Sequence, residues 1–171
     1  MNVLVVGGAG YIGSHMVKLL LEAGHETSTL DSLVTGHLDA VVGGELFKVD
    51  LGDVEALARV FESRPFDAVM HFAALAYVGE SVIDPAKYYQ NNIVGTLTLL
   101  DAMRSAGVNR IVFSSTCATY GEPDRVPITE SEKQAPINPY GFTKLAIEHA
   151  LADYAKAYGL SYAALRYFNA S

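Results

Sequence analysis

The segment NVLVVGGAGYIGSHMVKLL, residues 2–20, decides the fold. Its first part is an apolar run that predicts a buried strand over Asn2–Val6, and its last part has the apolar spacing of an amphipathic helix. Between them lie Gly7, Gly10 and Gly13, which allow a tight turn from strand to helix. A helix that begins directly after such a turn offers free backbone N–H groups to a phosphate. The segment therefore predicts a strand–turn–helix unit that binds the pyrophosphate of a dinucleotide.

The next part of the chain narrows the choice of dinucleotide, since the glycines alone could serve only a tight turn. Asp31 ends the second predicted strand, 18 residues beyond Gly13. A carboxylate at this place can accept hydrogen bonds from the adenosine ribose and would repel a 2′-phosphate. The residues that follow, Ser32, Leu33 and Val34, include no arginine that could pair with such a phosphate. We therefore expect NAD rather than NADP as the cofactor.

Short apolar runs alternate with longer helical patterns along the whole chain. Strands are expected at Asn2–Val6, Glu26–Leu30, Glu45–Val49, Ala68–Phe72, Arg110–Ser114 and Ser161–Tyr167. Helices are expected at Tyr11–Ala23, Val54–Ser63, Pro85–Ala106 and Pro139–Tyr158. This alternation predicts right-handed βαβ units and a doubly wound parallel sheet of the α/β class. Residues 1–171 are expected to form one Rossmann-type NAD-binding domain.

Local signals mark the ends of several expected helices. Gly24, Gly107 and Gly159 each follow a helical pattern and precede an apolar strand, so they are expected to take the left-handed conformation that closes a helix. Asp84-Pro85 and Asn138-Pro139 are expected starts, with a capping side chain followed by proline at the first helical position.

Polar and small residues recur where the expected strands end. In an open parallel sheet the binding crevice lies outside the carboxyl ends of the strands. The candidates at these ends are Gly7, Asp31, Asp50, Phe72-Ala73-Ala74, Ser114-Ser115-Thr116 and Tyr167-Phe168-Asn169. Asp50 could instead cap the helix that starts near Asp53.

The segment Tyr140–Lys144, with the sequence YGFTK, supplies candidate chemistry. Its phenol and ammonium lie four residues apart and share one face of a helix. A tyrosine with a pKa near ~10 is a poor base at neutral pH, and two nearby cations, Lys144 and a nicotinamide ring, would favour its phenolate form. A surface pair without a role is the alternative. Thr116 could donate a hydrogen bond to a substrate oxygen near Tyr140, or could satisfy only local backbone groups.

Composition excludes several classes of function. The chain has 171 residues and a formal net charge of −7, which argues against a nucleic-acid partner. The single cysteine, Cys117, fits a reducing compartment and is expected to pack as a small side chain. The five histidines show no metal-ligand spacing, so no metal is expected, and His71 is expected in the core. No secretory signal pattern and no apolar run of ~18 residues occur, so we expect a cytoplasmic protein with no membrane partner.

The longest stretch without periodicity is Tyr120–Ile137, which is rich in proline and acidic residues. A segment of this length in a compact domain is either a functional loop beside the site or a solvated surface excursion.

Several sequence strings together resemble one family. They are VGGAGYIGSH (6–15), HFAA (71–74), VGESV (78–82), YYQNN (88–92), SSTCATYG (114–121), PYG (139–141) and LRYFN (165–169). In this order they are similar to the extended short-chain dehydrogenase/reductases and, within them, to the N-terminal part of the UDP-glucose 4-epimerase family.

The resemblance implies a role for many residues. Tyr140 would be the base that takes the proton from the sugar 4-hydroxyl, Lys144 would tune it and hold the nicotinamide ribose, and Thr116 would bond the 4-oxygen. Hydride would pass from sugar C4 to NAD and return to the other face. Implied cofactor contacts are Gly7, Gly10, Tyr11, Ile12, Asp31, Asp50, Leu51, Phe72, Ala73, Ala74, Asn91 and Tyr167, to which the glycine pattern and the strand ends add Gly13 and Ser114. Asn169 would touch the UDP-sugar substrate.

Two departures from the family pattern leave alternatives open. Ala76 stands where many members carry a lysine near the cofactor phosphates. The resemblance also ends at Ser171, before a C-terminal domain that would grip the uridine and diphosphate. The chain could therefore be an NAD-binding fragment without turnover of its own. A UDP-arabinose 4-epimerase shares the same chemistry, whereas a 4,6-dehydratase would need an Asp-Glu pair where Cys117-Ala118 stand.

The two long helices expected at Pro85–Ala106 and Pro139–Tyr158 carry much apolar surface. The resemblance implies that they pair across a homodimer as a four-helix bundle. The alternative is that both helices use these side chains to cover the sheet.

Overall fold

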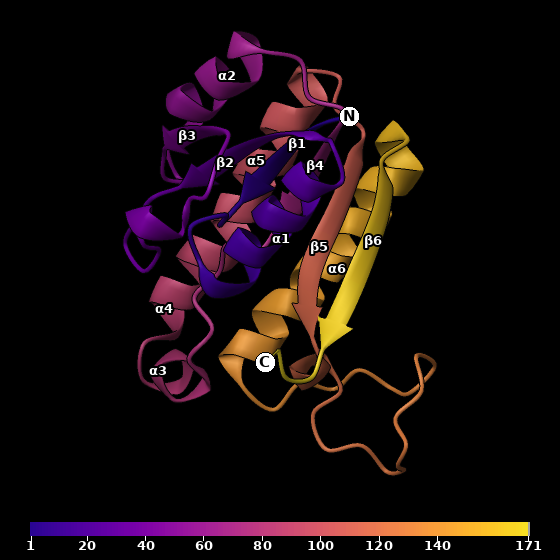
Figure 1. Ribbon diagram of the computed structural model, residues 1–171. Coiled ribbons are helices and arrows are strands. Elements are labelled where there is room, and N and C mark those ends of the chain that lie inside the picture. Colours follow the sequence, from indigo (N-terminus) through magenta and orange to yellow (C-terminus); the bar gives the residue numbers. More distant parts are fainter. Residues whose placement is uncertain (171) are drawn as a thin grey trace.

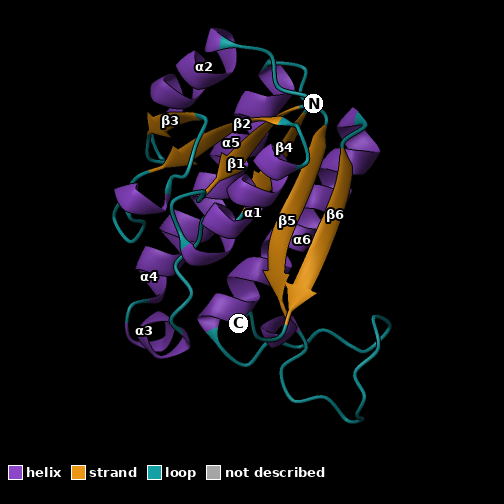
Figure 2. Ribbon diagram, viewed as in Figure 1, coloured by secondary structure: helices purple, strands orange, loops and turns teal. Residues whose placement is uncertain are grey.

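A computed structural model describes residues 1–170 and contains one six-stranded sheet in which every neighbouring pair of strands is parallel. The strand order is β3-β2-β1-β4-β5-β6. The strands are β1 (Asn2–Val6), β2 (Glu26–Asp31), β3 (Glu45–Lys48), β4 (Ala68–His71), β5 (Arg110–Thr116) and β6 (Ser161–Tyr167). All six expected strands are present, and the doubly wound α/β class is confirmed (Figures 1 and 2).

Helices cover the sheet unevenly. The main ones are α1 (Tyr11–Glu22), α2 (Val54–Ser63), α5 (Gly95–Ser105) and α6 (Pro139–Tyr158). One face carries α1, while α2, α5 and α6 lie on the other face, next to one another (Figure 1). Within the described part of the chain, no helix lies in front of β5 and β6 on the α1 face (Figure 2). Among these same residues, no helix is long and apolar enough to cross a bilayer.

Two apolar clusters hold these layers together. The larger lies between the sheet and α2, α5 and α6, and includes Leu57, Leu99, Phe113 and Ile147. The smaller lies under α1, where Val17 packs on the other face of β1. Alternate residues of one buried strand thus serve opposite faces of the sheet, as parallel sheets require.

The helix signals read from the sequence are present at the expected residues. Asn138 accepts a hydrogen bond from the backbone N–H of Gly141 at 2.8 Å and so caps α6. Asp84 caps α4 (Pro85–Tyr88) in the same way. Gly24, Gly107 and Gly159 all have positive φ, with values between +72° and +78°.

The expected single helix over Pro85–Ala106 needs a correction. The chain there forms α4, a wide π-helical turn at Tyr89–Val94, and then α5. A further short helix, α3 (Val78–Ile83), was not expected because six residues give too little periodicity to recognise. Single 3₁₀ turns at Leu38–Ala40 and Cys117–Thr119 were also not anticipated.

Candidate cofactor and catalytic site

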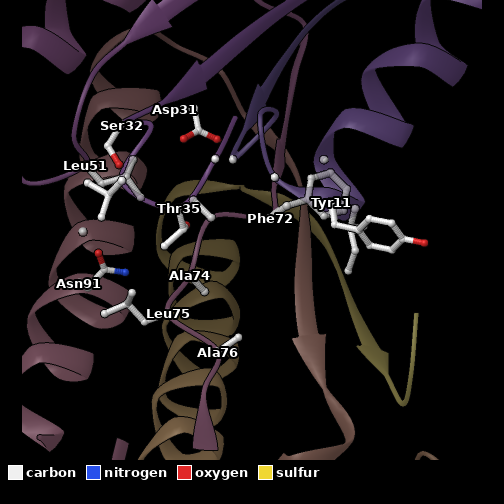
Figure 3. A pocket seen from close by; sticks show the side chains of 18 of the residues that line it. Tyr11, Asp31, Ser32, Thr35, Leu51, Phe72, Ala74, Leu75, Ala76 and Asn91 are labelled. Atoms are coloured by element: carbon white, nitrogen blue, oxygen red, sulfur yellow. The ribbon is translucent and has the colours of Figure 1, made fainter. Parts of the chain in front are cut away.

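A cavity of about 820 Å³ opens at the carboxyl ends of β1, β2 and β4. Its walls include most of the expected cofactor contacts, and Figure 3 shows Asp31 and Asn91 on different walls of it. The expected residues that line it are Gly7, Gly10, Tyr11, Ile12, Gly13, Asp31, Asp50, Leu51, Phe72, Ala73, Ala74, Asn91 and Asn169. Residues scattered over the sequence therefore meet at one edge of the sheet, because parallel strands end there together.

The glycine loop forms the floor of this cavity. A Cβ atom on Gly13 would lie 2.1 Å from the carbonyl oxygen of Gly7, so helix α1 can approach the loop only through a glycine. Gly7 itself has φ +82°, and a Cβ there would meet the backbone nitrogen of Ala73 at 2.5 Å. No side chain caps the start of α1 at Gly10. The backbone N–H groups of its first turn are thus available to an anion.

Tyr11, the first residue of α1, lines the cavity. The ring is 63% exposed, packs edge-on against His15 and extends away from Asp31 in Figure 3. We therefore expect Tyr11 to serve the site through its N–H group.

Asp31 lines the cavity and also stabilises the glycine loop through hydrogen bonds to its backbone. One carboxylate oxygen accepts a hydrogen bond from the N–H of Ala9 at 3.0 Å, and the other accepts one from the N–H of Leu33 at 2.9 Å. Each oxygen keeps a second lone pair for a ribose hydroxyl. Gly36 is needed beside it, since a Cβ there would lie 2.8 Å from the Asp31 carboxylate.

Asn92, which the sequence analysis did not single out, fixes another wall. It is 2% exposed and grips both backbone groups of Leu75, accepting from the N–H at 2.9 Å and donating to the carbonyl at 3.0 Å. The same amide donates to the Thr143 hydroxyl at 3.1 Å, and Thr143 donates to the Tyr140 carbonyl at 2.7 Å. One buried amide thus ties the cavity wall to the first turn of α6. The string YYQNN contains this residue, but no local sequence pattern indicates whether Asn91 or Asn92 turns inward.

Lys87 is another lining residue that sequence reasoning missed. Among the described residues that line the cavity it is the one lysine or arginine. Its ammonium pairs with the Glu80 carboxylate at 2.6 Å, and both side chains are partly exposed. Ala76, the departure from the family pattern, lines the same cavity without a charge.

The expected catalytic residues lie at the end of β5 and the start of α6, and they do not line the large cavity itself. Lys144 is 2% exposed, donates to the carbonyl of Ser114 at 2.9 Å and lies 4.7 Å from the centroid of the Phe113 ring. Burial lowers the pKa of Lys144 to about 7. The Ser114 carbonyl thus holds the Lys144 ammonium, and a cofactor contact of Ser114 stays a prediction.

Tyr140 and Thr116 interact, but protein groups alone do not make Tyr140 a better base. Burial raises the pKa of Tyr140 above its ordinary value, a hydrogen bond with Thr116 partly opposes this, and the nearby Cys117 adds to the rise. The expected lowering by Lys144 is not among these causes, and the Lys144 ammonium donates to the Ser114 carbonyl.

Thr116 serves the local backbone as well as Tyr140. Its hydroxyl oxygen accepts a hydrogen bond from the N–H of Ala118 at 3.2 Å. The hydroxyl hydrogen stays available to a further acceptor. The local backbone use that the sequence allowed for this residue therefore occurs, and donation to a substrate oxygen stays a prediction.

Two more expected residues lie elsewhere. His71 is buried, its Nε2 lies 2.9 Å from the Thr96 hydroxyl, and burial lowers its pKa to about 3, so it is a neutral core histidine as expected. Tyr167 is half-buried and lines a second cavity, of about 790 Å³, between β6, α6 and the loop after Thr119.

Comparisons with known proteins agree with this geometry. A UDP-glucose 4-epimerase of Rhizobium meliloti (strain 1021) is 54% identical over 170 residues, which make up 99% of this chain and 52% of that protein. The crystal structure of UDP-glucose 4-epimerase from Brucella ovis in complex with NAD matches with a TM-score of 0.98 and 59% identity, over 99% of this chain and 52% of that one. The UDP-glucose 4-epimerase of Thermotoga maritima with UDP-glucose matches with a TM-score of 0.94 and 40% identity, over 98% of this chain and 55% of that one.

The chain spans about half the length of the curated relatives that it matches. The model of the NAD dependent epimerase/dehydratase family matches residues 3–171. Since this match covers nearly the whole sequence, the chain belongs to the NAD dependent epimerase/dehydratase family.

Proposed function

We propose that this chain is the NAD-binding and proton-transfer half of a UDP-sugar 4-epimerase that interconverts UDP-glucose and UDP-galactose. The observation that carries the proposal is the hydrogen-bonded link through Asn92, which joins Leu75 on the cavity wall to Thr143 in the turn that holds Tyr140. The cavity proposed for the dinucleotide and the Tyr140–Lys144 pair thereby lie at the same edge of the sheet. The similarity to UDP-glucose 4-epimerases over the whole chain supports the same conclusion.

The residues of the large cavity fit NAD. The cavity volume lies within the range of small-molecule sites. The uncapped first turn of α1 suits a pyrophosphate, and the Asp31 carboxylate suits a ribose without a 2′-phosphate. Gly7 and Gly13 let the loop pack tightly against Ala73 and against the start of α1, which keeps the first turn of α1 beside the cavity.

Each residue of the proton-transfer pair has a separate task. When bound, NAD would supply the hydride acceptor and donor for the sugar C4. Tyr140 would take the proton from the 4-hydroxyl and later return it, while the Thr116 hydroxyl would donate to the 4-oxygen. Lys144 would donate to the hydroxyls of the nicotinamide ribose, and these acceptors would favour its charged form. A charged Lys144 and a cationic nicotinamide would then oppose the burial that raises the pKa of Tyr140.

One observation favours a second candidate function. Because the chain covers only about half of its relatives, it could hold NAD without turning over a sugar. Binding energy from remote parts of a substrate normally supports chemistry at the reacting centre, and those contacts would come from the other half of the relatives.

Two further proposals complete the assignment. A second copy of this chain would pair through residues 85–105 and α6, where Tyr89, in the π-helical turn before α5, and Phe142, in α6, form an exposed aromatic pair. The protein would work in the cytoplasm, which suits its free thiol at Cys117.

The experiment that tests the proposal follows the cofactor while substrate is added. Calorimetry should first show binding of NAD to the purified chain, with NADP at least ~10-fold weaker because of Asp31. UDP-galactose is then added to the NAD-loaded protein, and reduced-cofactor absorbance and UDP-glucose are measured. Appearance of UDP-glucose supports the epimerase. NAD binding without either signal supports the binding-only alternative, and absence of NAD binding contradicts both.

A further inference from the structure

A buried ion pair lies next to the proton-transfer site but outside it. Glu148, on α6, is 8% exposed, and its carboxylate meets the Arg166 guanidinium of β6 at 2.7 Å. Both Arg166 Nε and Nη2 donate to this carboxylate, so the pair is bidentate. Such a pair is geometrically specific, because two parallel hydrogen bonds fix both distance and orientation.

The same carboxylate collects two further donors. The Ser115 hydroxyl of β5 donates to one oxygen, and the Gln134 amide donates to the other at 3.0 Å. These donors, with Arg166, hold the pKa of Glu148 below its usual value although burial opposes this. The buried charge is therefore fully hydrogen-bonded, which is the condition for a buried ion pair to persist.

Arg166 extends the network to the long loop. Its Nη1 donates to the Tyr120 hydroxyl at 2.7 Å and to the Glu130 carbonyl at 3.4 Å. The guanidinium also lies 5.1 Å from the centroid of the Tyr120 ring. The loop Tyr120–Ile137, which the sequence left open as functional or solvated, is thereby attached at several points to α6 and β6.

Two members of the network, Glu148 and Ser115, lie beside residues of the proposed site. Glu148 lies one helical turn after Lys144 and two turns after Tyr140 on α6. Ser115 lies between Ser114, whose carbonyl accepts from Lys144, and Thr116. The network therefore joins the strand that carries Thr116 to the helix that carries Tyr140.

We propose that Glu148, with Arg166, is a positioning clamp that sets the separation between the Thr116 hydroxyl and the Tyr140 phenol. Neither residue touches the reacting atoms. The clamp acts through Ser115, which holds the end of β5 against α6. This inference deepens the proposed function and rests on it for the roles of Tyr140 and Thr116.

A purely structural ion pair would lower stability and leave Tyr140 unchanged. A positioning clamp also alters the titration of Tyr140, because the hydrogen bond with Thr116 opposes the rise in its pKa. The other ionisable groups beside Tyr140 are Cys117 and Lys144, and neither is altered in the variants below.

The experiment follows the Tyr140 side chain directly. Protein labelled with ¹³C at the ζ-carbon of tyrosine is titrated between about pH 7 and 12 in the presence and absence of NAD, and the Tyr140 resonance is assigned by its loss in Tyr140→Phe. In Ser115→Ala and Glu148→Gln we expect the pKa of Tyr140 to rise by about 0.5 to 1 unit, the scale of one lost hydrogen bond. NAD affinity should stay within about 2-fold of wild type, because the glycine loop and Asp31, which would bind the dinucleotide, are unchanged in these variants.

Two controls separate positioning from stability. Ser63→Ala removes a serine hydroxyl on α2 that donates only to the Val60 carbonyl, and Val60→Ala lowers stability by opening a small space in the distant core. Both should leave the Tyr140 titration unchanged. Ser115→Ala keeps the Glu148–Arg166 pair and is therefore expected to fold even if Glu148→Gln does not.

The outcome for the clamp is independent of the outcome for the cofactor. A Tyr140 titration in Ser115→Ala equal to that of wild type would overturn the clamp, whether or not NAD binds. A wild-type chain that does not bind NAD would contradict the proposed function, and the titrations without NAD would still test the clamp.

Discussion

Lys144 carries a charge that its surroundings disfavour. It is almost fully buried, and burial lowers its pKa from 10.5 to about 7. Its contacts are one carbonyl, of Ser114, and the face of the Phe113 ring. A buried lysine with a lowered pKa is not part of a solvent-exposed surface pair. Such perturbed groups are typical of functional sites, so this observation favours the functional interpretation of Tyr140–Lys144 over a surface pair without a role.

This burial predicts a pH-dependent stability. Between about pH 7 and 10.5 the unfolded chain binds more protons at Lys144 than the folded chain, so the free energy of unfolding should rise with pH. The rise reaches at most about 1.4 kcal/mol per pH unit and stops below the folded pKa and above the unfolded one. Urea unfolding at pH 7 and 9 should show wild type gaining about 2 kcal/mol relative to Lys144→Met. Parallel curves for the two proteins would show that Lys144 is charged and solvated.

Two glycines of the chain offer a matched pair of substitutions. Gly13→Ala places a methyl group 2.1 Å from the Gly7 carbonyl oxygen, whereas a methyl group on Gly79, in α3, meets nothing within 4 Å. We expect Gly13→Ala to cost about 2 to 4 kcal/mol of stability and to weaken NAD binding at least ~10-fold, since helix and loop must separate. Gly79→Ala should be neutral or stabilise by up to about 1 kcal/mol. Thermal unfolding and calorimetry measure both. Equal NAD affinity in wild type and Gly13→Ala would remove the loop from the binding site.

At the scale of elements, the start of α6 is held by two side chains. Asn138 accepts from the Gly141 N–H, and the Ser81 hydroxyl accepts from the Tyr140 N–H at 3.2 Å. The first turn of α6 is therefore held from two sides. This matters because Tyr140 lies in that turn.

The cap predicts a selective loss of function. Asn138→Ala should cost about 1 kcal/mol of stability and let the first turn of α6 fray, which would reduce epimerase turnover more than NAD affinity. Asp53→Ala removes a comparable cap from α2, where Asp53 accepts from the Ala56 N–H at 2.9 Å. It should cost a similar amount of stability with little effect on turnover. Turnover, NAD affinity and melting temperature of both variants decide this, and equal turnover losses in the two would contradict it.

Element boundaries were predictable wherever a strong local signal marks them. Asn138, Pro139 and Gly159 bound α6 at the expected residues, because capping side chains and positive φ act within one turn. The interruption of the second long helix was not predictable. The π-helical turn that interrupts it contains Asn92, which turns inward to hold Leu75, a residue 17 positions earlier in the chain.

The residues of the site, too, were only partly predictable from the sequence. Gly13 and Asp31 could be recognised from the sequence because they belong to a motif of fixed spacing that precedes and follows a strand. Glu148 could not, since a glutamate inside a helix is normally exposed. Its burial depends on donors from Arg166 and Gln134, which only the folded chain brings together. The rise in the pKa of Tyr140 was missed for a similar reason, because spacing alone does not reveal burial.

At the scale of the whole molecule, helices cover one face of the sheet along most of its width, whereas the α1 face of the described residues is uncovered at β5 and β6 (Figure 1). The last strand, β6, has mostly exposed or half-buried residues, and Tyr162 and Leu165 on it are more than 40% exposed. No helix covers β5 and β6 on the α1 face of the described chain (Figure 1). The curated relatives that the chain matches are about twice as long as this chain.

The exposed side chains on and next to α5 and α6 indicate whether a second copy of the chain could pack on them. Leu100, Met103 and Leu151 are almost fully buried against the sheet, which agrees with the alternative that these helices only cover it. Tyr89 and Phe142 remain 40% and 49% exposed and contact each other edge-on, with ring centroids 6.0 Å apart. An exposed aromatic pair between neighbouring helices is the kind of surface that a second copy could cover.

We therefore expect a concentration-dependent dimer that the aromatic pair controls. Sedimentation equilibrium of the wild-type chain should show a monomer–dimer equilibrium, and Phe142→Glu should weaken dimerisation at least ~10-fold by placing a charge in the interface. Val54→Glu is the control, because Val54 is 64% exposed at the start of α2, away from α6. It adds the same charge and should leave the equilibrium unchanged. A wild-type chain that sediments only as a monomer at all concentrations, or equal weakening by both substitutions, would exclude pairing through α5 and α6.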